Sequence, residues 1–200
     1  IYVTLDQVPE CVYNAFVAIE DERFWTHKGI DVRGIFRAAS FVLKSGDLSQ
    51  GASTLTQQLL KNTVFDGGSE TSNLAKIKRK VQEQYLAVQL EGRLDKKTIL
   101  EYYLNTINLG QNTLGVQAAS LRYFGKNVTD LTISEAAVIA GITQNPSAYN
   151  PISHPDNNSE KRATVLKYMK DQGYINETEY TEALNDDVYG RIAEYNESYS

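Results

Sequence analysis

Three short segments in the first half of the chain carry residue types suited to group transfer. Glu20 and Asp21 lead directly into aromatic residues, an amide- and hydroxyl-rich segment occupies 50–62, and a cationic cluster at 76–80 precedes Glu83. Carboxylates can activate a hydroxyl, and clustered cations can stabilise a leaving anion. Together these segments indicate chemistry that joins a sugar to an acceptor while a negatively charged group departs.

Glu20 is expected at the C-terminal end of a helix. The helix dipole disfavours a negative charge there, which raises proton affinity and suits a general base. The alternative is a solvated acidic turn, but Phe24 follows too closely for a turn that stays in water. His27 is one of two histidines, so a histidine-built metal site is excluded, and we expect it to orient the loop behind Glu20 and Asp21.

The second segment predicts a helix that begins at Thr54. Thr54, Gln58 and Lys61 are spaced four and three residues apart and therefore share one face of that helix. The N-terminal N–H groups near Ser53 and Thr54 are suited to phosphate or sugar oxygens. The alternative is a polar helix surface that binds nothing.

The third segment pairs Arg79 with Glu83, four residues apart. Such a pair on a helix surface is ordinary and contributes little. We expect this helix to be central, however, and a partly buried charge pair in a central helix indicates a functional site. Lys61, Arg79 and Lys80 could hold a pyrophosphate, and Glu83 could place a divalent ion or a water against it.

Helical periodicity dominates the elements that must position these groups. Residues 1–5 give only a weak strand signal, so the fold is predicted as mainly α without a parallel sheet. The helix over 73–91 is apolar on more than one side and is expected to be buried. One other expected helix ends at 19–20, one runs from Asp31 to Gly46, and others cover 54–62, 96–105, 116–124, 136–142 and 161–172, with short helices after them. Capping boxes are expected at Thr54 with Gln57 and at Thr132 with Glu135, and Gly125 is expected to end the helix over 116–124.

Composition and charge limit the classes of function. With 200 residues, 42 % of them hydrophobic, the chain can form a folded domain and is not a disordered segment. The net charge of −5 argues against a general nucleic-acid binder. The single Cys11 forms no internal disulfide. We find no apolar run of about eighteen residues and no signal peptide, and we expect the chain to be a piece of a longer protein.

Five ordered blocks between about Val8 and Ile175 carry a family resemblance. They are Glu20-Asp21-x-x-Phe24-x-x-His27-x-Gly29; Gly51-x-Ser53-Thr54-x-Thr56-Gln57-Gln58-x-x-Lys61-Asn62; Arg79-Lys80-x-x-Glu83; Glu101-x-Tyr103-Leu104-Asn105 through Lys126; and Glu135-Ala136 through Pro151. In these blocks the chain resembles the peptidoglycan glycosyltransferase (transglycosylase) domain of class A penicillin-binding proteins and of monofunctional glycosyltransferases.

The resemblance implies a mainly α, lysozyme-like helical domain with a small membrane-facing lobe at about 30–49. The domain would cover residues 1–176, with a C-terminal helical extension at 177–200 that could lead to a transpeptidase domain. The expected location is the extracytoplasmic face of a bacterial cell membrane, with an N-terminal anchor outside this chain. The expected partners are lipid II, the growing glycan chain, the membrane surface and other cell-wall synthesis proteins, with no nucleic acid.

The implied reaction is polymerisation of lipid II, in which Glu20 is the general base and undecaprenyl pyrophosphate leaves with inversion. Glu83 is the second catalytic carboxylate, near the pyrophosphate and tentatively holding Mg²⁺ or another divalent cation. Moenomycin-type phosphoglycolipids would occupy the donor site. The expected substrate-binding residues are Asp21, Phe24 and His27 in the Glu20 loop, Ser53, Thr54, Gln57, Gln58 and Asn62 in the second block, and Lys61, Arg79 and Lys80 at the pyrophosphate.

Two departures from the family pattern and two rival functions accompany this interpretation. Ala52 replaces a usual glycine, which is tolerated unless the backbone there needs positive φ, and Leu114 replaces a usual aromatic residue. One rival is a lysozyme-type enzyme that cleaves glycans, which would not need the cations. The other is a catalytically silent scaffold that binds lipid II, which would not need both Glu20 and Glu83.

Overall fold

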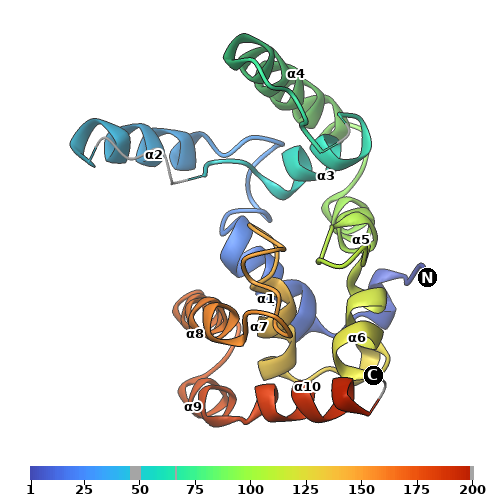
Figure 1. Ribbon diagram of the computed structural model, residues 1–200. Helices are drawn as coiled ribbons and strands as arrows, with labels where there is room; N and C mark the ends of the chain where they lie inside the picture. The colour runs from blue at the N-terminus through green and yellow to red at the C-terminus, as the bar shows by residue number, and fades with distance from the viewer. Residues whose placement is uncertain (46–50, 66, 199–200) are drawn as a thin grey trace. The chain divides into compact units, whose positions relative to one another are not determined.

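The computed structural model describes residues 1–45, 51–65 and 67–198, and all regular elements in these ranges are helical (Figure 1). The chain divides into two compact units. One comprises Ile1–Glu22 and Leu104–Ser200, and the other comprises Arg23–Tyr103. We call them the first and the second unit and describe each by itself. The predicted mainly α class without a parallel sheet is confirmed for the described residues.

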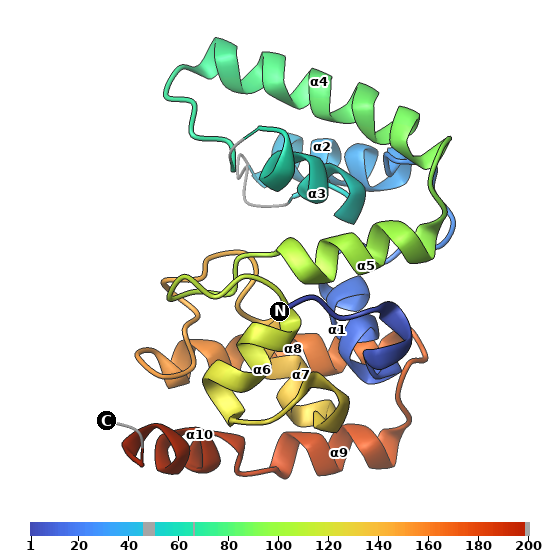
Figure 2. The same cartoon turned by 90° about the vertical axis from the view of Figure 1, so that its right-hand side faces the viewer.

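The first unit is built around α7 (Ile133–Ala140), whose residues from Ser134 to Ala140 are all buried. Helices α1, α6, α8 and α9 pack against α7, and α10 packs against α6 (Figures 1 and 2). The remaining elements of this unit are η1 (Leu5–Gln7), α1 (Glu10–Glu20), α6 (Val116–Phe124), η2 (Val128–Asp130), α8 (Pro155–Asp171), α9 (Glu177–Asn185) and α10 (Val188–Glu197).

Local capping signals set several helix ends as expected. Thr132 and Glu135 form the predicted capping box at the start of α7. Gly125 ends α6 with φ +67°, a left-handed conformation that glycine adopts without strain. The expectation for α8 was wrong at its start, because the helix begins at Pro155 and not at 161. Proline is compatible with the first turn of a helix, where its missing N–H has no intrahelical acceptor.

The second unit contains α2 (Val32–Ser45), α3 (Leu55–Thr63), α4 (Asn73–Glu91) and the first part of α5 (Lys96–Thr106). Asp31 caps α2 as predicted, since its Oδ1 accepts a hydrogen bond from Gly34 N at 3.0 Å. Gly29 has φ +102°, and a Cβ atom there would lie 2.6 Å from the backbone of Ala87. The loop before α2 therefore needs glycine to pack closely on α4.

The prediction that α4 is buried on more than one side was wrong. Ile77, Val81 and Tyr85 are 62 %, 60 % and 65 % exposed, and only Glu83 and Ala87 of this helix are buried. The buried side is the one that meets α3 and the Gly29 loop, where a small residue allows close approach. Ile77, Val81 and Tyr85 lie on the other side of the helix, whereas Leu86 and Leu90 are partly buried.

Several expectations for segment boundaries stay predictions. Gly46 and the end of the expected small lobe lie outside the described residues. The second compact unit, at 23–103, is larger than a lobe at 30–49. The boundary at 176 falls just before α9, which packs on α7 and α8 within the first unit. Among the described helices, none combines the length and apolar character needed to cross a membrane.

Candidate functional site

The predicted site residues are divided between the two units. Glu20 and Asp21 belong to the first unit, and all the others, from Phe24 to Glu83, belong to the second. The predicted site residues therefore form two separate groups, one around Glu20 and one around Glu83.

Glu20 is the last residue of α1, as expected, and is half-buried. The Thr143 hydroxyl, which follows α7 in the chain, donates a hydrogen bond to Glu20 Oε1. The same hydroxyl lies 3.1 Å from the carbonyl oxygen of Ala140. Behind Glu20, Gln172 Nε2 donates to the carbonyl of Ala18 at 2.9 Å and so satisfies a carbonyl at the end of α1.

An ammonium group also acts on Glu20. Lys161 of α8 donates to Gln144 Oε1 at 2.6 Å and lies 5.6 Å from the ring centre of Tyr149. Burial lowers the pKa of Lys161, and the negative charge of Glu20 opposes that change. Glu20 therefore has a hydroxyl donor from the segment after α7 and a cation from α8 in its surroundings.

Asp21, next to Glu20, is 5 % exposed and ends α1. Its backbone N–H donates to the carbonyl of Val17 at 3.0 Å. Burial of this carboxylate at the helix end is consistent with the expected role in shaping the Glu20 loop.

Glu83 is the buried centre of a charge cluster in the second unit. Its side chain is 1 % exposed, its Oε1 accepts from Arg79, and its Oε2 accepts from Lys80 at 3.2 Å. Lys80 also donates to the Ser53 hydroxyl, and Arg79 Nε donates to Glu70 Oε2 at 2.8 Å. Ser53, Arg79, Lys80 and Glu83 thus come together, and their contact with a ligand stays a prediction.

Lys61 joins this cluster through its position beside Gly68. A Cβ atom on Gly68 would lie 3.0 Å from Lys61 Cε and 3.0 Å from Arg79 Cζ, so the two long side chains converge there. The pKa of Lys80 is lowered, first by burial and then by the charges of Arg79 and Lys61. Three cations therefore lie within electrostatic reach of one another, an arrangement that an anionic ligand would stabilise.

At α3, some polar side chains are engaged in hydrogen bonds that hold the fold, and others keep polar atoms that could bind a ligand. Thr54 is buried, and its hydroxyl donates to the carbonyl of Gly29 at 2.7 Å and accepts from Gln57 N in the predicted capping box. Gln57 Oε1 accepts from Thr54 N, and Gln57 Nε2 has no hydrogen-bond partner among the described residues. Gln58 accepts from Tyr103 at 3.4 Å, and Asn62 is exposed. Direct contact of these residues with substrate stays a prediction.

His27 is held in a polar network of the second unit. Its Nδ1 accepts from Gly29 N at 3.1 Å and lies 3.2 Å from Lys96 Nζ, which also donates to Glu91 at 2.7 Å. Phe24 packs edge-to-face on His27, with ring centres 6.0 Å apart. These contacts hold His27 and Phe24 in the loop that His27 was expected to orient.

The fit of a metal ion to this site is poor. Both oxygens of Glu83 already accept from cations, which would repel a divalent ion placed beside them. In the described part of the chain, no group of three or more histidine, cysteine, aspartate or glutamate residues could hold a metal. The tentative divalent ion at Glu83 stays a prediction.

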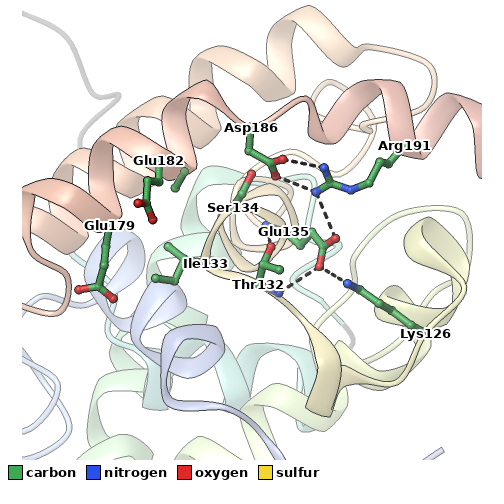
Figure 3. A pocket seen from close by; sticks show the side chains of 10 residues that line it. Lys126, Thr132, Ile133, Ser134, Glu135, Glu179, Glu182, Asp186 and Arg191 are labelled. Atoms are coloured by element: carbon green, nitrogen blue, oxygen red, sulfur yellow. Dashed lines mark hydrogen bonds and ion pairs between the residues drawn. The ribbon is translucent and has the colours of Figure 1, made fainter.

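A separate cavity of about 470 Å³ lies at the start of α7, the end of that helix opposite to Thr143 (Figure 3). Several charged side chains that line it form ion pairs with one another. Glu135 accepts from Lys126 at 2.7 Å and from Arg191 at 3.3 Å, and Arg191 pairs with Asp186. None of the predicted site residues lines this cavity. These pairs tie α10 to the start of α7.

Sequence reasoning missed Thr143, Lys161 and Glu70. Thr143 lies 123 residues from Glu20 in the chain, and no spacing rule connects the two. Lys161 entered only as the start of an expected helix, and Glu70 was not considered. Only the packing of α8 and the loop before α4 reveals these three partners.

Comparisons with known proteins show which family the chain belongs to. The family described as Transglycosylase matches residues 1–170. Penicillin-binding protein 1A of Aquifex aeolicus is 46 % identical over 184 residues, which cover 92 % of this chain and 24 % of that protein. Penicillin-binding protein 1A of Escherichia coli is 48 % identical over 187 residues, covering 92 % of this chain and 21 % of that protein.

A solved structure gives the same result for the fold. The crystal structure of penicillin-binding protein 1A from Haemophilus influenzae matches with a TM-score of 0.55 and 28 % identity, covering 93 % of this chain and 17 % of that one. The lysozyme-like helical fold is confirmed. The chain spans about a fifth to a quarter of the length of these curated relatives. The chain belongs to the transglycosylase family.

Proposed function

We propose that this chain is a peptidoglycan glycosyltransferase domain that polymerises lipid II. The observation that carries the proposal is the cationic cluster of Lys61, Arg79 and Lys80 around the buried Glu83. A pyrophosphate leaving group needs such a cluster, whereas hydrolysis of a glycosidic bond does not. The relatives named penicillin-binding protein 1A support the same function.

In the proposed step, Glu20 is the general base. A Glu20 oxygen takes the proton from the sugar hydroxyl of the acceptor, while the oxygen of that hydroxyl attacks the anomeric carbon of the donor. The bond between the anomeric carbon and the pyrophosphate oxygen breaks, and its electron pair leaves with the lipid pyrophosphate. The anomeric centre inverts, and no covalent sugar–enzyme intermediate forms.

The second unit supplies the charge for the leaving group. Lys61, Arg79 and Lys80 would stabilise the negative charge that develops on the pyrophosphate. Glu83 accepts from Arg79 and Lys80 and so holds these cations in place. Since the residues around Glu83 do not form a metal site by themselves, we assign no step to Mg²⁺.

We propose that α2 contacts the membrane surface. Phe36 and Leu43 are 70 % and 88 % exposed, and the basic residues Arg33, Arg37 and Lys44 lie on the same helix. Exposed apolar and basic side chains on one helix suit an anionic lipid surface. Our proposal puts the enzyme at the extracytoplasmic face of the bacterial membrane, as the family resemblance implies. A fused transpeptidase domain fits the greater length of the relatives.

The test is polymerisation of lipid II in detergent, comparing the wild type with Glu20→Gln by gel separation of glycan chains. We expect a ladder from the wild type and none from the variant. A variant with wild-type polymerisation would remove Glu20 as the base. Release of soluble glycan fragments from peptidoglycan would favour the lysozyme-type rival instead.

A silent scaffold is the second alternative, and binding separates it from an enzyme. A scaffold would bind a moenomycin-type phosphoglycolipid and give no ladder under any condition. The presence of both Glu20 and the Glu83 cluster favours the enzyme.

A further inference from the structure

Thr143 provides the hydrogen-bond donor that faces Glu20 in the first unit. Its Oγ1 is within hydrogen-bonding distance of two acceptors, Glu20 Oε1 and the carbonyl oxygen of Ala140. A threonine hydroxyl has one hydrogen and can serve only one acceptor at a time. The direction of this single hydrogen therefore depends on whether Glu20 carries a proton.

The two protonation states of Glu20 differ in the hydrogen bonds that they can make. The ionised carboxylate only accepts, so the hydroxyl hydrogen points to Oε1. Once Glu20 has taken a proton, the hydroxyl can turn its hydrogen to the Ala140 carbonyl and accept from the carboxylic acid instead. Thr143 can thus satisfy Glu20 before and after proton transfer without moving its backbone.

Other charged groups around Glu20 set the background for this contact. Lys161 on α8 acts electrostatically on Glu20, and Asp21 is its neighbour in the chain. Gln144 and Tyr149, from the segment after α7, contact Lys161 and not the Thr143 hydroxyl. Replacing Thr143 therefore leaves the cation in place and removes only the donor.

We propose that Thr143 is a positioning residue for the base: its hydroxyl donates to Glu20 Oε1 while Glu20 is ionised, and it can turn to the Ala140 carbonyl and accept from the acid once Glu20 carries a proton. This inference rests on the proposed function of Glu20. It goes beyond the family motifs, since Thr143 belongs to none of the matched residues that the sequence singled out.

The test compares Thr143→Val, which keeps the shape and removes the hydroxyl, with Thr143→Ser, which keeps the hydroxyl. Each is measured for kcat and KM of lipid II polymerisation across the pH range 5 to 9. Thr164→Val is the matched control, because its hydroxyl donates only to the carbonyl of Glu160 within α8. Thermal melting establishes that each variant is folded.

For Thr143→Val we expect kcat to fall roughly tenfold, with KM within about twofold. The hydroxyl favours the ionised carboxylate, so its loss should move the acid limb of the kcat profile up by about half to one pH unit. Thr143→Ser should restore both values, and Thr164→Val should match the wild type. If Thr143→Val does not fold, Thr143→Ser against Thr143→Ala gives the same comparison.

Three results would overturn the inference. They are a Thr143→Val enzyme with wild-type kcat and an unmoved acid limb, a change confined to KM, and a Thr143→Ser enzyme as impaired as Thr143→Val. Glu20→Gln in the same assay separates the two levels of the argument. If Glu20→Gln polymerises like the wild type, the proposed base itself fails, whereas an inactive Glu20→Gln with an unaffected Thr143→Val removes only the role of Thr143.

Discussion

Glu20 and Glu83 are two carboxylates of similar importance that the structure holds in opposite ways. Glu20 is half-buried at a helix end and accepts from a neutral hydroxyl that can reverse its role. Glu83 is 1 % exposed, and both of its oxygens accept from cations. A base must change its charge during turnover, and a structural counter-ion must keep it.

This difference explains the division of roles between the two units. To deprotonate an acceptor, Glu83 would first have to displace Arg79 or Lys80 from its oxygens. Glu20 Oε1 instead accepts from the neutral Thr143 hydroxyl. We therefore propose that the acceptor is activated in the first unit and that the charge of the leaving group is stabilised in the second.

The largest effect expected in the second unit comes from Glu83→Gln. Loss of the carboxylate leaves Arg79 and Lys80 without their shared counter-ion, and breaking a buried pair costs about 3 kcal/mol of unfolding free energy. We expect a lower melting temperature and loss of polymerisation. Asp171→Asn breaks an exposed pair with Lys167 at the same helical spacing and should leave the melting temperature unchanged. Equal melting temperatures for Glu83→Gln and wild type would contradict this role.

Lys61→Ala should weaken ligand binding without unfolding the protein. One charge-assisted contact to a phosphate is removed, so affinity for a moenomycin-type phosphoglycolipid should fall roughly tenfold. Isothermal titration at low and high salt measures the change, which should shrink as salt rises. Lys76→Ala, an exposed cation on α4, is the control. Unchanged affinity would mean that Lys61 is only a surface charge.

Glu70→Gln should raise the affinity for the same phosphoglycolipid, by less than Lys61→Ala lowers it. Glu70 accepts from Arg79 Nε, and Arg79 lowers the pKa of Glu70, so this carboxylate stays ionised and competes with a phosphate for Arg79. Its neutralisation should tighten the same ligand about threefold. Weaker binding would show instead that Glu70 orients Arg79 for the ligand.

The smallest effect concerns the Arg23–Asp31 pair at the start of α2. The Arg23 guanidinium hydrogen bond lowers the pKa of Asp31 below 3.8, so the pair stabilises the fold above that pH and is lost as pH falls through the lowered value. In Asp31→Asn, urea unfolding should show about 0.5–1 kcal/mol less stability at pH 7 and a flatter acid dependence below pH 4. Asparagine can still cap the helix, so a larger loss would point to another cause.

The sequence predicted the elements that depend on neighbouring residues. The capping boxes at Thr54 and Thr132, the Asp31 cap and the Gly125 end are each decided within a few residues and are confirmed. The five blocks also led to the correct family. Ala52 is not among the described residues with positive φ, in agreement with the expectation that a methyl group is tolerated there.

The failures concern contacts that no local pattern specifies. Periodicity predicted that α4 is buried on more than one side, whereas its buried Ala87 packs closely on Gly29, which is far away in the chain. The Thr143 contact to Glu20 joins residues 123 positions apart, and Thr143 carries no motif. The start of α8 at Pro155 was also missed, although proline suits the first turn of a helix.

The most direct test of the division of roles is the affinity of Glu20→Gln for a moenomycin-type phosphoglycolipid, measured on the same preparation that is assayed for turnover. We predict wild-type affinity together with no glycan ladder, because the cationic cluster of the second unit is intact while the base is gone. A variant that loses binding and turnover together would contradict the account, since Glu20 would then contribute to the ligand site itself.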